Sequence, residues 1–97
     1  MGSEMCIRDR ERVCKLVKEN PRYAEILLRA IKVEENKSGD HYFLGWEWHE
    51  VRAWPAELMK LVREGIVNIT YKSRRYTHYK LADRDAIKRA LKRCYLS

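Results

Sequence analysis

The chain has 97 residues, which is enough for one compact domain and too few for several. Its residues are 45% hydrophobic and 36% charged, a mixture that excludes a disordered tail or a low-complexity segment. No apolar run reaches the roughly 18 residues that a membrane span needs, and no secretory signal follows the start. We therefore expect a cytoplasmic protein without a membrane partner.

Positive charge is concentrated in the second half of the chain. Residues 1–50 carry nine basic and ten acidic side chains, a net charge of −1, whereas residues 51–97 carry twelve basic and four acidic ones, a net charge of +8. A domain with one strongly positive end attracts a polyanion, such as nucleic acid or an acidic protein or membrane surface. The alternative is that the cations only keep the domain in solution, but such a surface would intersperse both signs.

The first ten residues are expected to be a leader outside the native domain. Residues 2–9, Gly-Ser-Glu-Met-Cys-Ile-Arg-Asp, resemble one reading-frame translation of a transposon-derived adapter used in sequencing libraries. That origin would make residues 1–10 an artefact of a metagenomic assembly, and the native chain could then extend further upstream. The alternative is a Gly-Ser cloning scar before a native start at Met5. We expect Cys6 to carry no chemistry and residues 11–97 to form a single domain.

Two helices are predicted before residue 36. Apolar residues at helical spacing indicate the first over residues 11–19. Asn20 and Pro21 end it and supply the cap and first-turn proline of the second, over residues 21–35. The core-facing stripe of the second helix contains Ala24, Leu27, Leu28 and Ile31, widened by Tyr23 and Ile26. Residues 36–40 are a turn by composition.

Residues 42–49 are predicted to form a short strand, because the apolar period changes there from 3.6 to 2. One face of this strand would carry Tyr42, Leu44, Trp46 and Trp48. The shared parity favours tryptophans that are buried in the core or against a partner over tryptophans that stack on single-stranded bases. Exposed indoles would instead indicate a protein interface.

A single helical turn is expected between His49 and Trp54, followed by a helix that Pro55 opens and Gly65 stops. Its inward residues are expected to be Leu58, Leu61 and Val62, and its outward residues Ala56, Glu57, Lys60 and Arg63.

Residues 66–81 are rich in β-branched and aromatic residues and predict a β-hairpin with the loop Ser73, Arg74 and Arg75. In this register Val67 faces Leu81, Ile69 faces Tyr79 and Tyr71 faces Thr77. One face of the hairpin is then apolar, whereas a two-residue loop would set apolar residues against polar ones.

Asp83 is expected to cap a final helix. Its apolar side would carry Ala86, Ile87, Ala90, Leu91 and Cys94, and its basic side Arg84, Lys88, Arg89, Lys92 and Arg93. This basic side either holds phosphates or is a solvated exterior, and we expect the hairpin loop to lie beside it.

The order of these elements is that of a winged helix-turn-helix domain, an α+β fold. The segment LMKLVREGIVNITYKSRRYTHYKL resembles the recognition helix and wing of small prokaryotic and archaeal-type DNA-binding domains. The residues that carry the resemblance are Leu58, Leu61, Val62, Gly65, Ile66 and Val67. Over residues 21–82 it implies a three-helix core with a β-hairpin wing, flanked here by N- and C-terminal helices. The single turn before Pro55 departs from the family pattern and favours binding led by the wing.

The resemblance implies a protein that binds duplex DNA, as a transcriptional regulator or accessory factor. Residues 66–81 contain four basic side chains and no acidic one, so they suit contacts to phosphates or a minor groove. The candidate nucleic-acid-binding residues are Lys60, Arg63, Lys72, Ser73, Arg74, Arg75, Tyr76, His78 and Lys80. Arg74 and Arg75 are expected to contribute most. The alternative is that the charged loop only prevents edge-to-edge pairing of the hairpin.

Winged helices also serve as protein-docking modules, so a second hypothesis is a module of a replication, transcription or defence complex that docks through the surface around its tryptophans. A third is a homodimer formed through the first or last helix. We expect no enzyme, cofactor, metal site or small-molecule substrate, because no catalytic constellation or phosphate-binding glycine loop is present. Cys14 and Cys94 lack partners at metal-ligand spacing and are expected to be small buried thiols.

Overall fold

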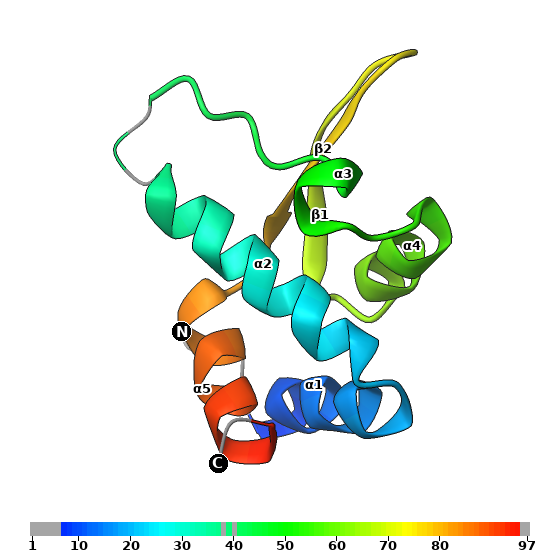
Figure 1. The fold of residues 1–97 in the computed structure, drawn as a ribbon, viewed down its shortest axis with the longest axis vertical. Coiled ribbons are helices and arrows are strands. Elements are labelled where there is room, and N and C mark those ends of the chain that lie inside the picture. Colours follow the sequence, from blue (N-terminus) through cyan, green and yellow to red (C-terminus); the bar gives the residue numbers. More distant parts are fainter. Residues whose placement is uncertain (1–6, 38, 40, 96–97) are drawn as a thin grey trace.

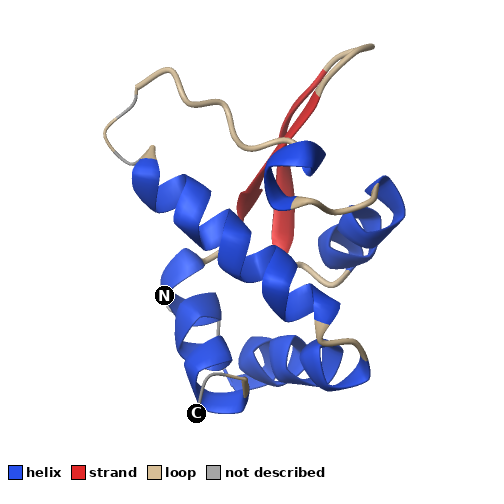
Figure 2. Cartoon of the chain, viewed as in Figure 1, coloured by secondary structure: helices blue, strands red, loops and turns tan. Residues whose placement is uncertain are grey.

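The computed structural model describes residues 7–37, 39 and 41–95, which form an α+β fold (Figures 1 and 2). Five helices occur in this part of the chain: α1 (Ile7–Glu19), α2 (Arg22–Asn36), α3 (Trp48–Val51), α4 (Pro55–Arg63) and α5 (Arg84–Cys94). Two strands, β1 (Val67–Lys72) and β2 (Thr77–Leu81), pair as one antiparallel sheet. The predicted α+β class is confirmed at this level.

Helix α2 runs through the middle of the molecule (Figure 1). Helices α1 and α5 pack against each other at one end, α4 packs against β1, and the hairpin tip projects from the opposite end. The core contains large buried side chains from α2, α4, α5 and the segments just before α3 and β1. Among them are Ile26, Leu27, Trp46, Leu58, Leu61, Ile66, Ile87 and Leu91. No helix among the described residues combines the length and apolar character required to cross a membrane.

Helix α1 begins at Ile7, four residues before the predicted start at residue 11. The hypothesis that residues 1–10 are a non-native leader stays a prediction, and Cys6 lies outside the described residues. The predicted stripe of α2 is buried at Tyr23, Ala24, Ile26, Leu27 and Ile31, and Leu28 is half-buried. In the predicted turn over residues 36–40, Asn36 still belongs to α2, and residues 38 and 40 lie outside the described part.

A buried carboxylate extends the stripe of α2. Glu34, which is 8% exposed, lies one turn after Ile31. Its Oε2 accepts hydrogen bonds from Trp46 Nε1 at 2.8 Å and from the Leu81 backbone N–H at 2.7 Å. Arg84 Nη1 lies 4.0 Å from its other oxygen. One side chain thus joins α2 to the Trp46 segment and to β2.

The predicted strand over residues 42–49 is wrong. Only Trp46 pairs there, through two 2.9 Å backbone hydrogen bonds with Tyr79. Gly45 has φ of +136°, and a Cβ at this position would lie 2.6 Å from Tyr79 O, so the chain bends against β2 where only glycine fits. The carbonyls of Leu44 and Gly45 accept hydrogen bonds from the side chains of Thr70 and His78 instead of from a strand ladder.

The hairpin register is confirmed near its base and wrong near its tip. Val67 faces Leu81 and Ile69 faces Tyr79 as predicted, but a bulge at Thr70 then sets Tyr71 opposite His78. The predicted pair of Tyr71 with Thr77 is therefore absent, and the loop has four residues, 73–76. The extra residue at the bulge shifts the register of the outer half of β1.

The predicted cap of α5 is confirmed, because Asp83 Oδ1 accepts a 3.1 Å hydrogen bond from the Ala86 backbone N–H. The predicted apolar side of α5 is also confirmed, with Ala86, Ile87, Ala90 and Leu91 buried. For α4, Leu58 and Leu61 are buried as expected, and Val62 is half-buried.

Cys14 and Cys94 form a disulfide that ties α1 to α5. Their Cα atoms lie 5.7 Å apart, within the usual range for such a bond. The prediction of separate buried thiols is wrong, because 80 residues of sequence separate two cysteines that the packing of α1 on α5 brings together. Disulfides are uncommon in the cytosol, so the expected cytoplasmic location stays a prediction.

Candidate nucleic-acid interface

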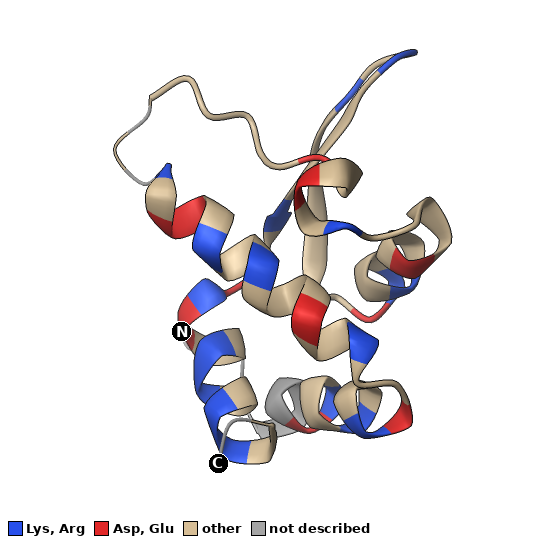
Figure 3. Ribbon diagram, viewed as in Figure 1, with Lys and Arg blue, Asp and Glu red and all other residues tan. Residues whose placement is uncertain are grey.

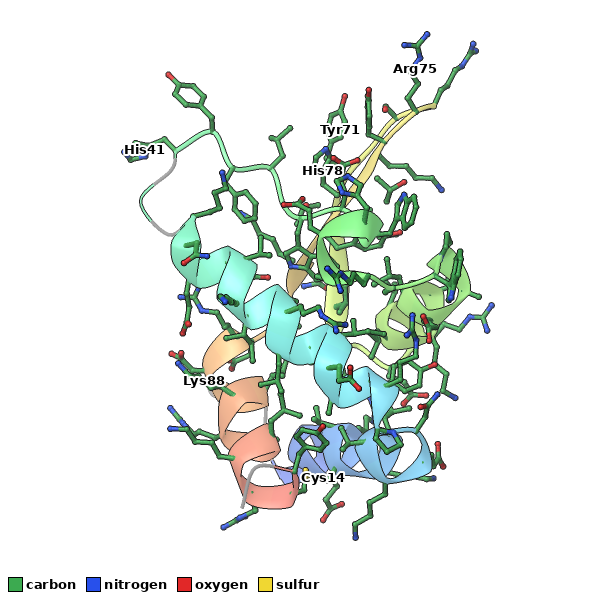
Figure 4. The ribbon with its side chains drawn as sticks, viewed as in Figure 1. Cys14, His41, Tyr71, Arg75, His78 and Lys88 are labelled. Atoms are coloured by element: carbon green, nitrogen blue, oxygen red, sulfur yellow. A yellow bond between two sulfur atoms is a disulfide. The ribbon has the colours of Figure 1, made fainter. Side chains whose placement is uncertain are left out.

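Three cations gather at the hairpin tip, which we define as residues 72–76. Lys72 ends β1, and Arg74 and Arg75 lie in the loop, all three exposed. In the part of the chain that the structure describes, no ion pair or hydrogen bond involves their side chains. Figure 3 shows this basic tip projecting from the body, and in Figure 4 the Arg75 side chain points away from the rest of the chain. The tip therefore presents cations that no carboxylate of the described fold neutralises.

Ser73 shapes the tip. Its backbone N–H donates a 2.8 Å hydrogen bond to Tyr76 O, and its Oγ accepts hydrogen bonds from the backbone N–H groups of Arg75 and Tyr76. These bonds are the reason that the turn closes between residues 73 and 76. Among the predicted site residues, Ser73 thus shapes the loop that carries Arg74 and Arg75, and Tyr76, the next residue in the chain, is 52% exposed.

The remaining predicted residues of the hairpin lie further from the tip. The His78 ring meets the Tyr71 ring edge to face at 5.6 Å, and His78 Nδ1 donates to Gly45 O at 2.9 Å. Lys80 Nζ lies 5.3 Å from the centre of the Phe43 ring. Both His78 and Lys80 are half-buried and contact residues 43–45, so they fasten that segment to the hairpin.

Helix α4 contributes Lys60 and Arg63, both of which are exposed. Glu57 does not point outward as predicted. Its side chain is 16% exposed and turns toward α2, where Oε2 accepts a 2.6 Å hydrogen bond from Arg22 Nε. Its Oε1 accepts a 2.8 Å hydrogen bond from the Trp54 backbone N–H. The Glu57 carboxylate is therefore engaged by Arg22 and by the start of α4.

Helix α5 lies at the far end of the molecule from the hairpin tip (Figures 1 and 3). The expectation that the loop lies beside this basic helix is wrong, because the apolar side of α5 packs on α1 and α2. Lys88 Nζ is also 2.7 Å from Glu35 Oε2, and Arg84 lies beside Glu34. The positive charge of the second half of the chain is therefore divided between two ends.

Two of the three tryptophans are exposed. Trp46 is fully buried and stacks on Tyr79 at 5.4 Å between ring centres, as its strand parity predicted. Trp48 is 48% exposed against expectation, and Trp54 is 65% exposed. Trp48 leaves the core because it begins α3, whose N-terminus is capped by a hydrogen bond from the Glu47 backbone N–H to the Glu50 carboxylate. The sequence signal for that helix start was Glu50, because a Glu three residues after the N-cap position completes half of a capping box.

The pKa of Glu57 lies below its ordinary value of 4.5. Burial raises this pKa, but the hydrogen bonds from Arg22 and from the Trp54 backbone, with the charge of Arg22, lower it by more. A carboxylate whose pKa is lower in the folded state stabilises the fold above its unfolded pKa, and this stability is lost as pH falls through the folded pKa.

We therefore expect Glu57→Gln to lower the free energy of unfolding by about 1 kcal/mol at pH 7 and by much less at pH 3. Thermal unfolding of both proteins at the two pH values measures this difference. Glu25→Gln is the control, because the one ion pair that Glu25 forms among the described residues is an exposed contact with Arg29 at 3.5 Å. An equal loss at both pH values would show that the ionised carboxylate is not what stabilises the start of α4.

Comparisons with protein-family models, with curated proteins and with solved structures found no match to this chain. Within residues 7–37, 39 and 41–95, no three His, Cys, Asp or Glu side chains are grouped so as to hold a metal ion.

Proposed function

We propose that this chain is a winged helix-turn-helix domain. In this assignment α2, α3 and α4 are the three-helix core, β1 and β2 are the wing, and α1 and α5 are flanking additions. The Trp46–Tyr79 bridge supports it, because this pairing adds a minimal third strand beside the hairpin. Helix α4, which follows the single turn of α3 and packs on β1, would be the recognition helix.

More particularly, we propose that the domain binds duplex DNA, as a transcriptional regulator or accessory factor. The observation that carries this proposal is the hairpin tip, whose three cations have no carboxylate partner among the described residues. Lys and Arg side chains on a projecting turn reach phosphates or an adjacent minor groove with little desolvation of other groups. Because α3 has only four residues, binding is led by the tip, and Lys60 and Arg63 of α4 add phosphate contacts.

We expect the double variant Arg74→Ala/Arg75→Ala to bind random duplex DNA about tenfold or more weakly at moderate salt, because two phosphate contacts are lost. Fluorescence anisotropy over a series of KCl concentrations measures both affinity and its salt dependence. The slope of log K against log salt should become shallower by about 2 in the variant.

The matched control is Arg89→Ala/Lys92→Ala, which removes the same charge from the exposed side of α5. It should retain most of the affinity, because α5 lies far from the hairpin tip (Figure 3). Equal losses from the two double variants would mean that net charge alone drives binding and would contradict the proposed interface. Tighter binding to single strands or RNA than to the duplex would contradict the proposed ligand.

Homodimerisation through α1 or α5 stays a prediction. Light scattering of the protein with and without a duplex tests it, since a dimer doubles the measured mass.

A further inference from the structure

A hollow of about 330 Å³ lies between the start of α2 and the α3–α4 connection. None of its lining residues belongs to the hairpin tip. We call it the tryptophan hollow; its lining residues are Arg22, Trp48, His49, Arg52, Ala53 and Trp54. The two exposed indoles line it together with Ala53, which is 2% exposed. Its volume is at the low end of the range of ligand pockets, and Trp and Arg are the residues that most often dominate binding at protein interfaces.

Arg52 has a backbone conformation that glycine adopts more easily than any other residue. Its φ of 54° and ψ of 46° place it in the left-handed region as the C-cap of α3. A side chain is disfavoured in this conformation. The Arg52 side chain is exposed and makes no hydrogen bond or ion pair within the described residues. No contact of the side chain within the described fold explains an arginine at this position, whereas a ligand in the hollow would pair with it.

Hydrogen bonds between helices hold the backbone around the hollow in place without a partner. Arg22 Nη2 donates a 2.9 Å hydrogen bond to Arg52 O, and Arg22 Nε is bound to Glu57. Glu57 in turn holds the Trp54 backbone N–H. These bonds join α2, the connection and the first turn of α4, so the backbone around the hollow loses little conformational entropy when a partner binds.

We propose that the tryptophan hollow binds a peptide segment of another protein, in which an aromatic or branched aliphatic side chain is followed by a carboxylate. The apolar side chain would lie between Trp48 and Trp54, and the carboxylate would pair with Arg52. A single strand of nucleic acid suits the site less well, because Arg52 is the one lining cation without an ion pair among the described residues, which suits a single carboxylate better than a run of successive phosphates. This inference does not depend on DNA binding.

The test uses short Gly-Ser peptides that carry Phe-Asp-Asp or the charge-reversed Phe-Lys-Lys, titrated into isotope-labelled protein. The Phe-Asp-Asp peptide should shift the amide resonances of residues 48–54 and bind more tightly than Phe-Lys-Lys. Trp54→Ala should weaken this binding about tenfold, as expected for an interface tryptophan. Arg52→Gly should weaken it about threefold to fivefold, as expected for an exposed ion pair. Arg74→Ala, which removes a charge at the hairpin tip, should leave it unchanged.

Arg52→Gly also has an expected effect on the fold, because glycine adopts the left-handed conformation without strain. Its melting temperature should rise by a few degrees while peptide affinity falls. A lower melting temperature would show that the arginine serves the fold and would overturn the proposal. So would the absence of binding at several millimolar peptide, equal affinity for both peptides, or tighter binding of a thymidine oligonucleotide to residues 48–54.

Discussion

Reduction of the Cys14–Cys94 disulfide is expected to lower the free energy of unfolding by about 4 kcal/mol, because the bond closes a loop of 80 residues in the unfolded chain. For a domain of this size, that loss corresponds to a fall of roughly 15 °C or more in melting temperature. The measurement is thermal unfolding with and without dithiothreitol, in a Cys6→Ser background so that no third thiol exchanges.

The control for this prediction is Cys14→Ser/Cys94→Ser, whose melting temperature should match that of the reduced protein and should not respond to the reductant. Thiol titration of the unreduced, denatured chain without substitutions should find one free thiol among its three cysteines. Three reactive thiols, or a melting temperature unaffected by reductant, would contradict the bond. Repeating the measurement in glutathione buffers set to the redox potential of the cytosol would test whether the bond survives in the cytoplasm, which is the expected location.

Glu34→Ala is expected to lower the free energy of unfolding by about 2–5 kcal/mol, because it leaves two buried donors without an acceptor. These donors are the indole N–H of Trp46 and the backbone N–H of Leu81, which share one carboxylate oxygen. Glu34→Gln keeps an acceptor oxygen and should cost less than Glu34→Ala. Urea unfolding followed by fluorescence reports on the variants directly, since Trp46 itself loses its partner.

The neighbouring residue supplies the control for this substitution. Glu35 is exposed, and its one ion pair within the described residues is with Lys88 on α5, so Glu35→Ala should cost much less than Glu34→Ala. Similar losses from the two substitutions would mean that the buried network around Glu34 contributes no more than a surface ion pair.

Helices α2, α4 and α5 were predictable because each carries a local signal. The Asn20–Pro21 pair, Pro55 and Asp83 mark helix starts, and the apolar stripes give the buried faces. The segment over residues 42–49 was mispredicted because its conformation depends on contacts that alternation of residue types does not encode. Gly45 bends against β2, and side chains from the distant hairpin bind the carbonyls before Trp46.

For the candidate site too, some features could be predicted from the sequence and others could not. The composition of residues 66–81 was sufficient to predict the cations at the hairpin tip. It could not predict the bulge at Thr70, which shifts the outer pairs, or the distance between the tip and α5. The left-handed conformation of Arg52 and the burial of Glu57 against Arg22 also arise from packing between elements, so both were missed.

Nuclear magnetic resonance of the isotope-labelled, disulfide-bonded protein titrated with a random duplex tests the proposed interface most directly. The account predicts that amide resonances of residues 72–76 move most, followed by those of α4, and that those of α5 stay in place. Shifts concentrated on α5, or a titration that leaves residues 72–76 unmoved while the duplex binds, would contradict it.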